Sequence, residues 1–252
     1  MHNPMDFSGR TVLVTGGGKG VGRGISERFL AAGAEVAICG RNPPDSLPAA
    51  GGREAFFVAC DVRRHEQLEA LVNAVIERCG RLDVLVNNAG GAPHAEAATA
   101  SPRFHESIIA LNLTSALHAA QLANRVMQQQ EDGGSIINIA SVSTIRPSPG
   151  TAAYGAANSL AVEWGPKVRI NAIIAGLVET EQSHLHYGDA EGVAAVGRTI
   201  PLGRMAVPGD IGDACLFLAS PLASYISGSS IAVHGGGEKP AFLQAANAGT
   251  GA

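Results

Sequence analysis

Residues 11–22 read TVLVTGGGKGVG, and this stretch decides the fold. The residues from Thr11 to Thr15 are β-branched or apolar, which predicts a short buried strand. Five of the next seven residues are glycine, so the backbone can turn tightly before the helical pattern that begins near Arg23. Such a turn brings backbone N–H groups and a helix N-terminus close to a diphosphate. An ordinary strand-to-helix turn uses the same residue types, so this motif alone does not establish a nucleotide site.

Short β-branched runs alternate with helical patterns along the rest of the chain. The runs are Thr11 to Thr15, Glu35 to Cys39, Ala55 to Cys60, Val84 to Val86, Ser135 to Ile139, Arg169 to Ile174 and Ser230 to Val233. The helical patterns include Gly22 to Ala32, Gln67 to Cys79 and Phe104 to Gln130, while Pro43 to Gly52 reads as a surface loop. We predict an α/β fold of the Rossmann type, a doubly wound parallel sheet of about seven strands in a three-layer α/β/α arrangement. Residues 1–252 should form a single domain.

Composition and charge point toward small-molecule ligands. The net charge of −4 offers no broad basic field, so we expect no nucleic-acid partner and no anionic membrane partner. No segment keeps about 18 apolar residues in a row, and Met1 to Arg10 lacks the apolar stretch of a signal peptide. The four cysteines lie far apart without CxxC spacing, as in a reduced cytoplasmic protein. We expect cytoplasmic localisation.

Further polar motifs follow the later strands in a fixed order. Asp61 and Val62 follow the third strand, and Asn87-Asn88-Ala89-Gly90 follows the fourth. Asn112 lies on the long helical pattern, and Ser141 ends the fifth strand, thirteen positions before Tyr154. With Thr15-Gly16-x-x-x-Gly20-x-Gly22, these motifs resemble the short-chain dehydrogenase/reductase pattern from about Phe7 to Gly236, most nearly that of 3-oxoacyl reductases.

The resemblance implies an NAD(P)-dependent oxidoreductase that interconverts a ketone and a secondary alcohol. The cofactor-binding residues that it implies are Gly16, Gly18, Lys19, Gly20, Val21, Gly22, Arg41, Asp61, Val62, Asn88, Ala89, Gly90, Tyr154, Gly176, Val178 and Thr180. NAD-selective sites usually place an acidic residue after the second strand, whereas this chain has Gly40-Arg41-Asn42 there. Arg41 and Lys19 would suit a 2′-phosphate, which favours NADP(H) over NAD(H). The alternative is that both are solvated surface cations.

The same resemblance implies Ser141, Tyr154 and Asn112 as catalytic residues, with Tyr154 moving a proton to or from the substrate oxygen. A buried Asn also needs hydrogen bonds for structural reasons, so the two interpretations of Asn112 overlap. A free Tyr has a pKa of about 10 and needs nearby positive charge to act as a base near neutrality.

Family members supply part of that charge with a Lys four residues after the Tyr, where this chain has Asn158. The run from Tyr154 to Trp164 looks like the family helix with about eight residues removed, which would shorten the crossover by roughly 12 Å and make it hard to close. Three explanations are open. The sequence lacks an internal segment that the working protein has, or a true deletion leaves a nucleotide-binding protein with impaired catalysis, or Lys167 or another cation supplies the charge.

The remaining expectations concern the substrate and the assembly. Residues 181–199 occupy the place of the family's substrate lid, and 241–252 form a small-residue tail. His184 and His186 lack the partners of a metal site, so we expect no metal. The acidic segment from Met127 to Asp132 argues against an acidic carrier protein and toward a small, CoA-linked or cyclic substrate. The resemblance implies a homodimer or homotetramer.

Overall fold

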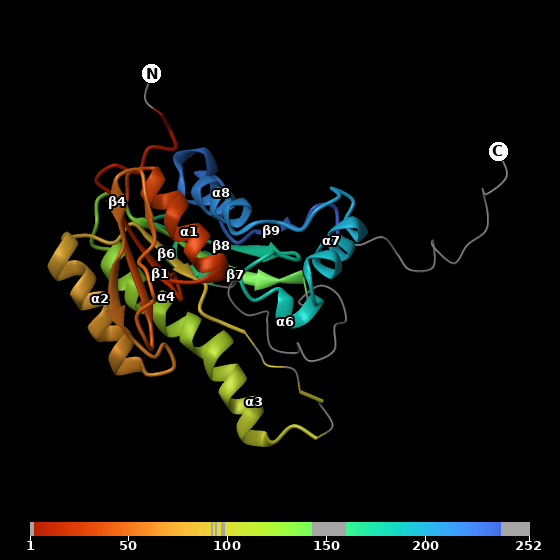
Figure 1. Cartoon of the computed structure of the whole chain (residues 1–252). Helices are drawn as coiled ribbons and strands as arrows, with labels where there is room; N and C mark the ends of the chain where they lie inside the picture. Colours follow the sequence, from red (N-terminus) through yellow and green to blue (C-terminus); the bar gives the residue numbers. More distant parts are fainter. Residues whose placement is uncertain (1–2, 92, 94, 97–98, 143–159, 238–252) are drawn as a thin grey trace.

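A seven-stranded parallel sheet forms the centre of the computed structural model, which describes residues 3–91, 93, 95–96, 99–142 and 160–237. The strand order is β5-β2-β1-β6-β7-β8-β9. The strands are β1 (Thr11–Thr15), β2 (Glu35–Gly40), β5 (Phe56–Ala59), β6 (Val84–Asn87), β7 (Gly134–Ser141), β8 (Val168–Ala175) and β9 (Ser230–Val233). Helices cover both faces of the sheet, so the fold has three layers in the order α/β/α (Figure 1). This confirms the predicted doubly wound α/β fold.

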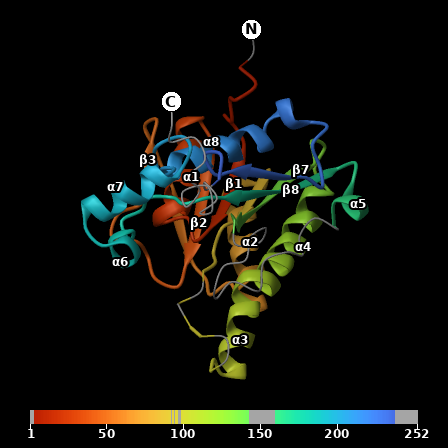
Figure 2. The same ribbon diagram turned by 90° about the vertical axis from the view of Figure 1, so that its right-hand side faces the viewer.

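Alternate side chains of the strands point to opposite faces and pack under different helices. Val12 and Val14 lie in a core cluster with residues of α1 (Gly20–Ala31) and α8 (Pro208–Ala219). Leu13 faces the other way, into a cluster with residues of α2 (His65–Cys79), α4 (Ser115–Met127) and α5 (Leu160–Trp164). Figure 2 shows α1 and α8 on one side of the sheet and α4 on the other. The helix α8 was not among the predicted elements.

The long helical pattern from Phe104 to Gln130 forms three consecutive helical segments. These are α3 (Pro102–Ile109), a π-helical turn (Ala110–Thr114) and α4. Ser101 caps α3, because its side chain accepts a hydrogen bond from the Phe104 N–H at 3.2 Å. The π-helical turn carries Asn112, so the widened turn coincides with a predicted site residue.

The sheet is wound in two directions from its middle. The chain builds β2 and β5 outward from one side of β1, and then β6, β7, β8 and β9 outward from the other side. All strands of this sheet are parallel, so their carboxyl ends share one edge, and the order reverses between β1 and β6. Ligands of such sheets bind at this reversal point.

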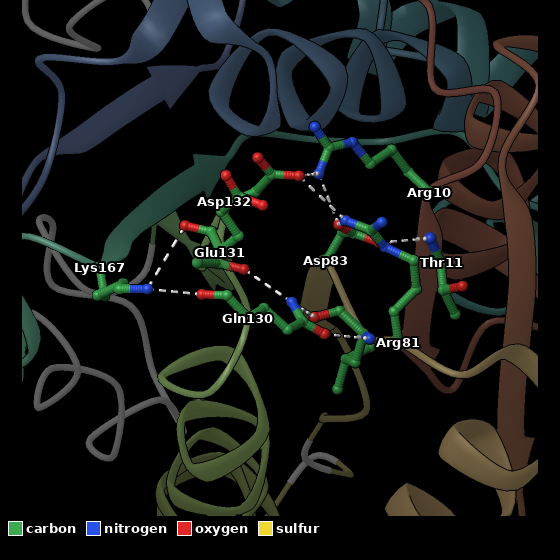
Figure 3. Close-up of polar contacts among 10 residues, drawn as sticks. Arg10, Thr11, Arg81, Asp83, Gln130, Glu131, Asp132 and Lys167 are labelled. Carbon is green, nitrogen blue, oxygen red and sulfur yellow. Dashed lines mark hydrogen bonds and ion pairs between the residues drawn. The ribbon is translucent and has the colours of Figure 1, made fainter.

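The amino edge of the sheet is held by a buried carboxylate. Asp83, 5% exposed, accepts hydrogen bonds from the backbone N–H of Thr11 and from the guanidinium groups of Arg10 and Arg81 (Figure 3). Asp132 pairs with the same two arginines. This cluster therefore joins β1, β6 and the loop before β7 at the edge opposite the reversal point.

One segment, Pro43 to Gly52, differs from the surface loop expected from the sequence. The Pro43 to Gly52 loop contributes β3 (Ala49–Ala50), which pairs with β4 (Arg53–Glu54) in a small hairpin. Residues 181–199 carry α6 (His184–Tyr187) and α7 (Ala190–Thr199), with the Asp189 side chain capping α7 through the Gly192 N–H at 3.0 Å. Among the described residues no helix combines the length and the apolar character needed to cross a membrane.

Strands β7 and β8 are adjacent and parallel in the sheet. The two strands pair from Gly134 opposite Val168 to Ser141 opposite Ala175. Of the connection, α5 is described and has five residues. Residues 143–159 of the connection lie outside the described residues, so the expectation that the crossover would be hard to close stays a prediction.

Candidate functional site

The glycine turn after β1 makes close contacts that only glycine allows. Gly16 has a φ of 64°, in the left-handed region, and a Cβ there would lie 3.2 Å from the Cα of Ala89. A Cβ on Gly22 would collide with the carbonyl oxygen of Gly16. The turn thus packs directly against the start of α1 and against the segment after β6.

Asn88 holds this turn in place. Its side-chain amide donates hydrogen bonds to the carbonyl oxygens of Thr15 at 2.9 Å and Gly16 at 3.3 Å. The Thr15 hydroxyl accepts in return from the backbone N–H groups of Asn88 and Ala89, both at 3.0 Å. The Asn88 amide group is therefore occupied by the turn, while Ala89 and Gly90 border the adjacent cavity.

A cavity of about 490 Å³ lies at the carboxyl ends of β1, β2 and β5. Predicted site residues contribute half of its lining: Gly16, Gly18, Lys19, Arg41, Asp61, Val62, Ala89 and Gly90. The other lining residues are Cys39, Gly40, Asn42, Pro44, Phe57, Cys60, Arg63 and Leu111. The structure therefore brings together residues from four separate segments of the sequence around one space large enough for part of a dinucleotide.

The cavity combines three cations with one carboxylate. Lys19, Arg41 and Arg63 line it together with Asp61. Arg63 binds Asp61 in a bidentate manner, with Nε 2.9 Å from Oδ1 and Nη2 2.6 Å from Oδ2. Its guanidinium lowers the pKa of the Asp61 carboxyl to about 2, and the charge of Arg41 contributes to the same shift. Sequence reasoning missed Arg63, although it follows the predicted Asp61-Val62 pair directly.

The loop after β8 reaches the N-terminus of α1. A carboxylate oxygen of Glu181 accepts a hydrogen bond from the Gly20 N–H at 3.1 Å. A Cβ on Gly20 would lie 3.6 Å from the methyl carbon of Thr180. The predicted residues Gly20 and Thr180 are thus neighbours, and a carboxylate of the protein itself lies where the helix N-terminus attracts anions.

The end of β7 and the segment after β8 lie side by side. Ser141 is the last residue of β7 and is paired with Ala175 of β8. Gly176 follows, its N–H donating to the Val233 carbonyl oxygen at 2.9 Å, and Val178 pairs with Ala206 in an isolated bridge. Ser141, Gly176 and Val178 therefore lie at the same edge of the sheet as the glycine turn. Tyr154 and Asn158 lie outside the described residues.

The Asn112 side chain makes three hydrogen bonds to backbone groups. Its amide nitrogen donates to the carbonyl oxygens of Gly91 at 3.0 Å and Ile108 at 2.9 Å, and its oxygen accepts from the Gly91 N–H at 2.8 Å. Both amide donors are therefore used in joining the π-helical turn to the segment after β6. These contacts support the structural interpretation of Asn112.

Lys167 lies far from Ser141. Its Nζ donates to the carbonyl oxygens of Gln130 at 2.7 Å and Glu131 at 3.4 Å, at the amino edge (Figure 3). The eight residues of β8 separate this edge from the carboxyl end, a length of roughly 26 Å at 3.3 Å per residue. Lys167 therefore cannot supply charge beside Ser141, so the third explanation for Asn158 now requires another cation.

The acidic segment from Met127 to Asp132 also lies at the amino edge, where Asp132 pairs with Arg10 and Arg81. The segment turns into β7 there, at the end of the sheet opposite the cavity. It therefore gives no argument against a carrier protein. Among the described residues, no group of three or more His, Cys, Asp or Glu side chains could hold a metal ion.

Comparison with known proteins places this arrangement in a family. The family model described as enoyl-(acyl carrier protein) reductase matches residues 16–238. The chain is 34% identical to a 3-oxoacyl-(acyl-carrier-protein) reductase from Chlamydia trachomatis over 242 residues, covering 90% of this chain and 96% of that protein. It is 33% identical to 3beta-hydroxysteroid dehydrogenase 1 of Eggerthella lenta over 247 residues, covering 92% and 94%.

A solved structure is similar over almost the whole chain. A 7α-hydroxysteroid dehydrogenase complexed with NADH and 7-oxo glycochenodeoxycholic acid superposes with a TM-score of 0.82 at 29% identity, covering 94% of this chain and 98% of that one. The chain belongs to the short-chain dehydrogenase/reductase family. It is an NAD(P)-dependent oxidoreductase of the kind that interconverts ketones and alcohols.

Proposed function

We propose that this protein uses NADP(H), in preference to NAD(H), to interconvert a ketone and a secondary alcohol, with Tyr154 as the acid/base. The observation that carries the proposal is the cavity after β1, β2 and β5, in which Lys19 and Arg41 stand beside the glycine turn. The close contacts of Gly16 and Gly22 suit a backbone cradle for a diphosphate.

The preference for NADP(H) follows from the charges at the end of β2. An NAD site usually has a carboxylate there that accepts from the ribose hydroxyls, and the same carboxylate would repel a 2′-phosphate. Arg41 occupies the position instead and lines the cavity with Lys19. Two cations at this rim favour a phosphate by direct attraction and hydrogen bonding.

The adenine end would contact Asp61 and Val62, and Ala89 and Gly90 would border the adenosine ribose. Gly18, Gly20, Val21 and Gly22 would lie along the diphosphate, held in shape by Asn88. Gly176, Val178 and Thr180 would lie toward the nicotinamide, since they follow β8 beside Ser141. A bound nicotinamide cofactor supplies hydride transfer to or from the substrate carbon.

The proton would be moved by this chain's own residues. Ser141 at the end of β7 would hold the substrate oxygen by a hydrogen bond, and Tyr154 would donate a proton to that oxygen during reduction and accept it during oxidation. Asn112 would act through its backbone contacts by fixing the segment around Gly91. Residues 181–199 would form the lid over the substrate.

Asn158 supports a second candidate, a nucleotide-binding protein with impaired turnover. Without a Lys at this position, the Tyr154 phenolate lacks one stabilising charge, so proton transfer would slow. Intact mass separates the first two explanations of the short helix. A measured mass that exceeds the mass of the 252-residue chain by about eight residues would show that the protein has the full family helix. A measured mass equal to that of the 252-residue chain would support the form with impaired catalysis.

The substrate is proposed as a small, CoA-linked or cyclic carbonyl compound. The named relatives differ widely in substrate, so the fold does not choose among them. We also propose a homodimer or homotetramer acting in the cytoplasm.

A competition between NADP⁺ and NAD⁺ tests the cofactor choice, since Arg41→Ala should lower the preference for NADP⁺ by about tenfold, the value of one charge-assisted contact. A clear preference of the native protein for NAD⁺ would contradict the role of Arg41.

A further inference from the structure

Asp61 and Arg63 form a unit at the wall of the cavity. Besides the two guanidinium contacts, the backbone N–H of Arg63 donates to Asp61 Oδ1 at 3.1 Å. Both side chains line the cavity, and those of Asp61 and Arg63 are 21% and 35% exposed. The carboxylate is therefore held in one orientation by a single neighbouring residue.

Counting lone pairs identifies which carboxylate oxygen remains available. An ionised carboxylate offers about four acceptor positions, two on each oxygen. Oδ1 accepts from both the backbone N–H and Nε of Arg63, whereas Oδ2 accepts from Nη2 alone. Arg63 thus fills Oδ1 and leaves one acceptor position on Oδ2.

The local turn is held by other hydrogen bonds as well. The backbone N–H of Arg64 donates to the Asp61 carbonyl oxygen at 2.9 Å, and the Asp61 N–H donates to the Gln67 side chain at 2.7 Å. These bonds define the path from β5 into α2 without the Arg63 guanidinium. The guanidinium is therefore available for a role in orienting the carboxylate.

We propose that Arg63 is a positioning residue that presents Asp61 Oδ2 to the 6-amino group of the adenine ring. This inference rests on the proposed dinucleotide site. The guanidinium also neutralises the carboxylate beside the phosphates of the ligand, so that Asp61 can read an amino group without repelling the rest of the cofactor.

The test compares NADP⁺ with its hypoxanthine analogue, in which a carbonyl oxygen replaces the 6-amino group. A carboxylate accepts from the amino group and is repelled by the carbonyl oxygen, so the native protein should bind NADP⁺ about tenfold more tightly than the analogue. In Arg63→Ala this ratio should fall to about twofold, because Asp61 is no longer oriented. Arg63→Lys keeps the charge without the two-pronged contact and should fall between them.

Arg64→Ala is the matched control. It removes the same charge from the next position, where the structure records no side-chain contact of Arg64 among the described residues, so it should keep the tenfold ratio. Asp61→Asn should abolish the preference, and adding Arg63→Ala to Asp61→Asn should change the ratio no further. Thermal unfolding of each variant reports whether it is folded.

The outcomes separate this inference from the proposed function. If Arg63→Ala weakens both ligands equally and keeps the ratio, Arg63 acts only as a charge and the inference is overturned. Equal affinity of the native protein for both ligands would also overturn it, while leaving the dinucleotide site intact. Failure of the native protein to bind either ligand would contradict the proposed function itself.

Discussion

The Glu181 carboxylate lies at the N-terminus of α1, where it accepts a hydrogen bond from the Gly20 N–H at 3.1 Å. A bound diphosphate would need the same donor and the same positive end of the helix dipole. Glu181 must therefore leave before a dinucleotide can bind there. We expect Glu181→Gln to raise the affinity for NADP⁺.

The size of this effect follows from two contributions. A carboxylate at a helix N-terminus stabilises the free protein by about 0.3–1 kcal/mol, and that contribution is lost on binding. Repulsion between two like charges 4 Å apart in water is about 1 kcal/mol, and the displaced but nearby carboxylate feels part of it. Glu181 is exposed, so we take a total of about 1 kcal/mol, or about a fivefold gain in affinity.

The assay is titration of NADP⁺ into the native protein and the variant at low salt and at about 0.3 M salt, where screening should reduce the gain. Glu179→Gln is the matched control, because Glu179 is exposed and carries the same charge two residues earlier. An unchanged or weaker affinity in Glu181→Gln would refute the reasoning, and so would an equal gain in Glu179→Gln.

Three further predictions follow from other contacts. Asp83→Asn should lower the free energy of unfolding in urea by about 2 kcal/mol, because the buried carboxylate that accepts from the Thr11 N–H and from two arginines loses its charge. NADP⁺ affinity should stay unchanged, and a loss of affinity in the folded variant would contradict the separation of the two edges. Gly22→Ala should weaken NADP⁺ binding by about tenfold or more, since its Cβ collides with the turn; native affinity would argue against a tight cradle. The depressed pKa of Asp61, about 2, means that its contribution to stability is present above pH 4 and is lost as the pH falls toward 2. After discounting for exposure, native protein and Asp61→Asn should differ by about 1 kcal/mol at pH 7 and converge near pH 2; a constant difference would exclude this linkage.

The sheet could be predicted from the sequence because its strands are short β-branched runs with clear breaks between them. Strand β1 and strand β9 begin and end at the predicted residues, and the other strands differ by one or two residues at their ends. The π-helical turn around Asn112 has no periodicity signal of its own, since an inserted residue shifts a helical pattern only slightly. The helix α8 contains two interior glycines, Gly209 and Gly212, which weaken its helical pattern.

The site was predictable where it consists of local motifs and unpredictable where it depends on distant contacts. The glycine turn and Asp61 follow strands directly, so parallel topology predicts that they share an edge. Glu181 reaches Gly20 across 161 positions of sequence, and no local pattern encodes that contact. For a related reason, the segment from Met127 to Asp132 gives no argument against a carrier protein. The helix α4 runs antiparallel to the strands, so its end lies at their amino edge, away from the cavity.

The central claim, that this protein reduces a carbonyl group with NADPH through Tyr154, is tested most directly by following NADPH absorbance. The native protein and Tyr154→Phe would be compared against a panel of small, CoA-linked and cyclic ketones. We expect substrate-dependent oxidation of NADPH by the native protein and a loss of at least about a hundredfold in Tyr154→Phe, the usual contribution of a general acid, with NADP⁺ binding retained. Unchanged turnover in Tyr154→Phe would contradict the account.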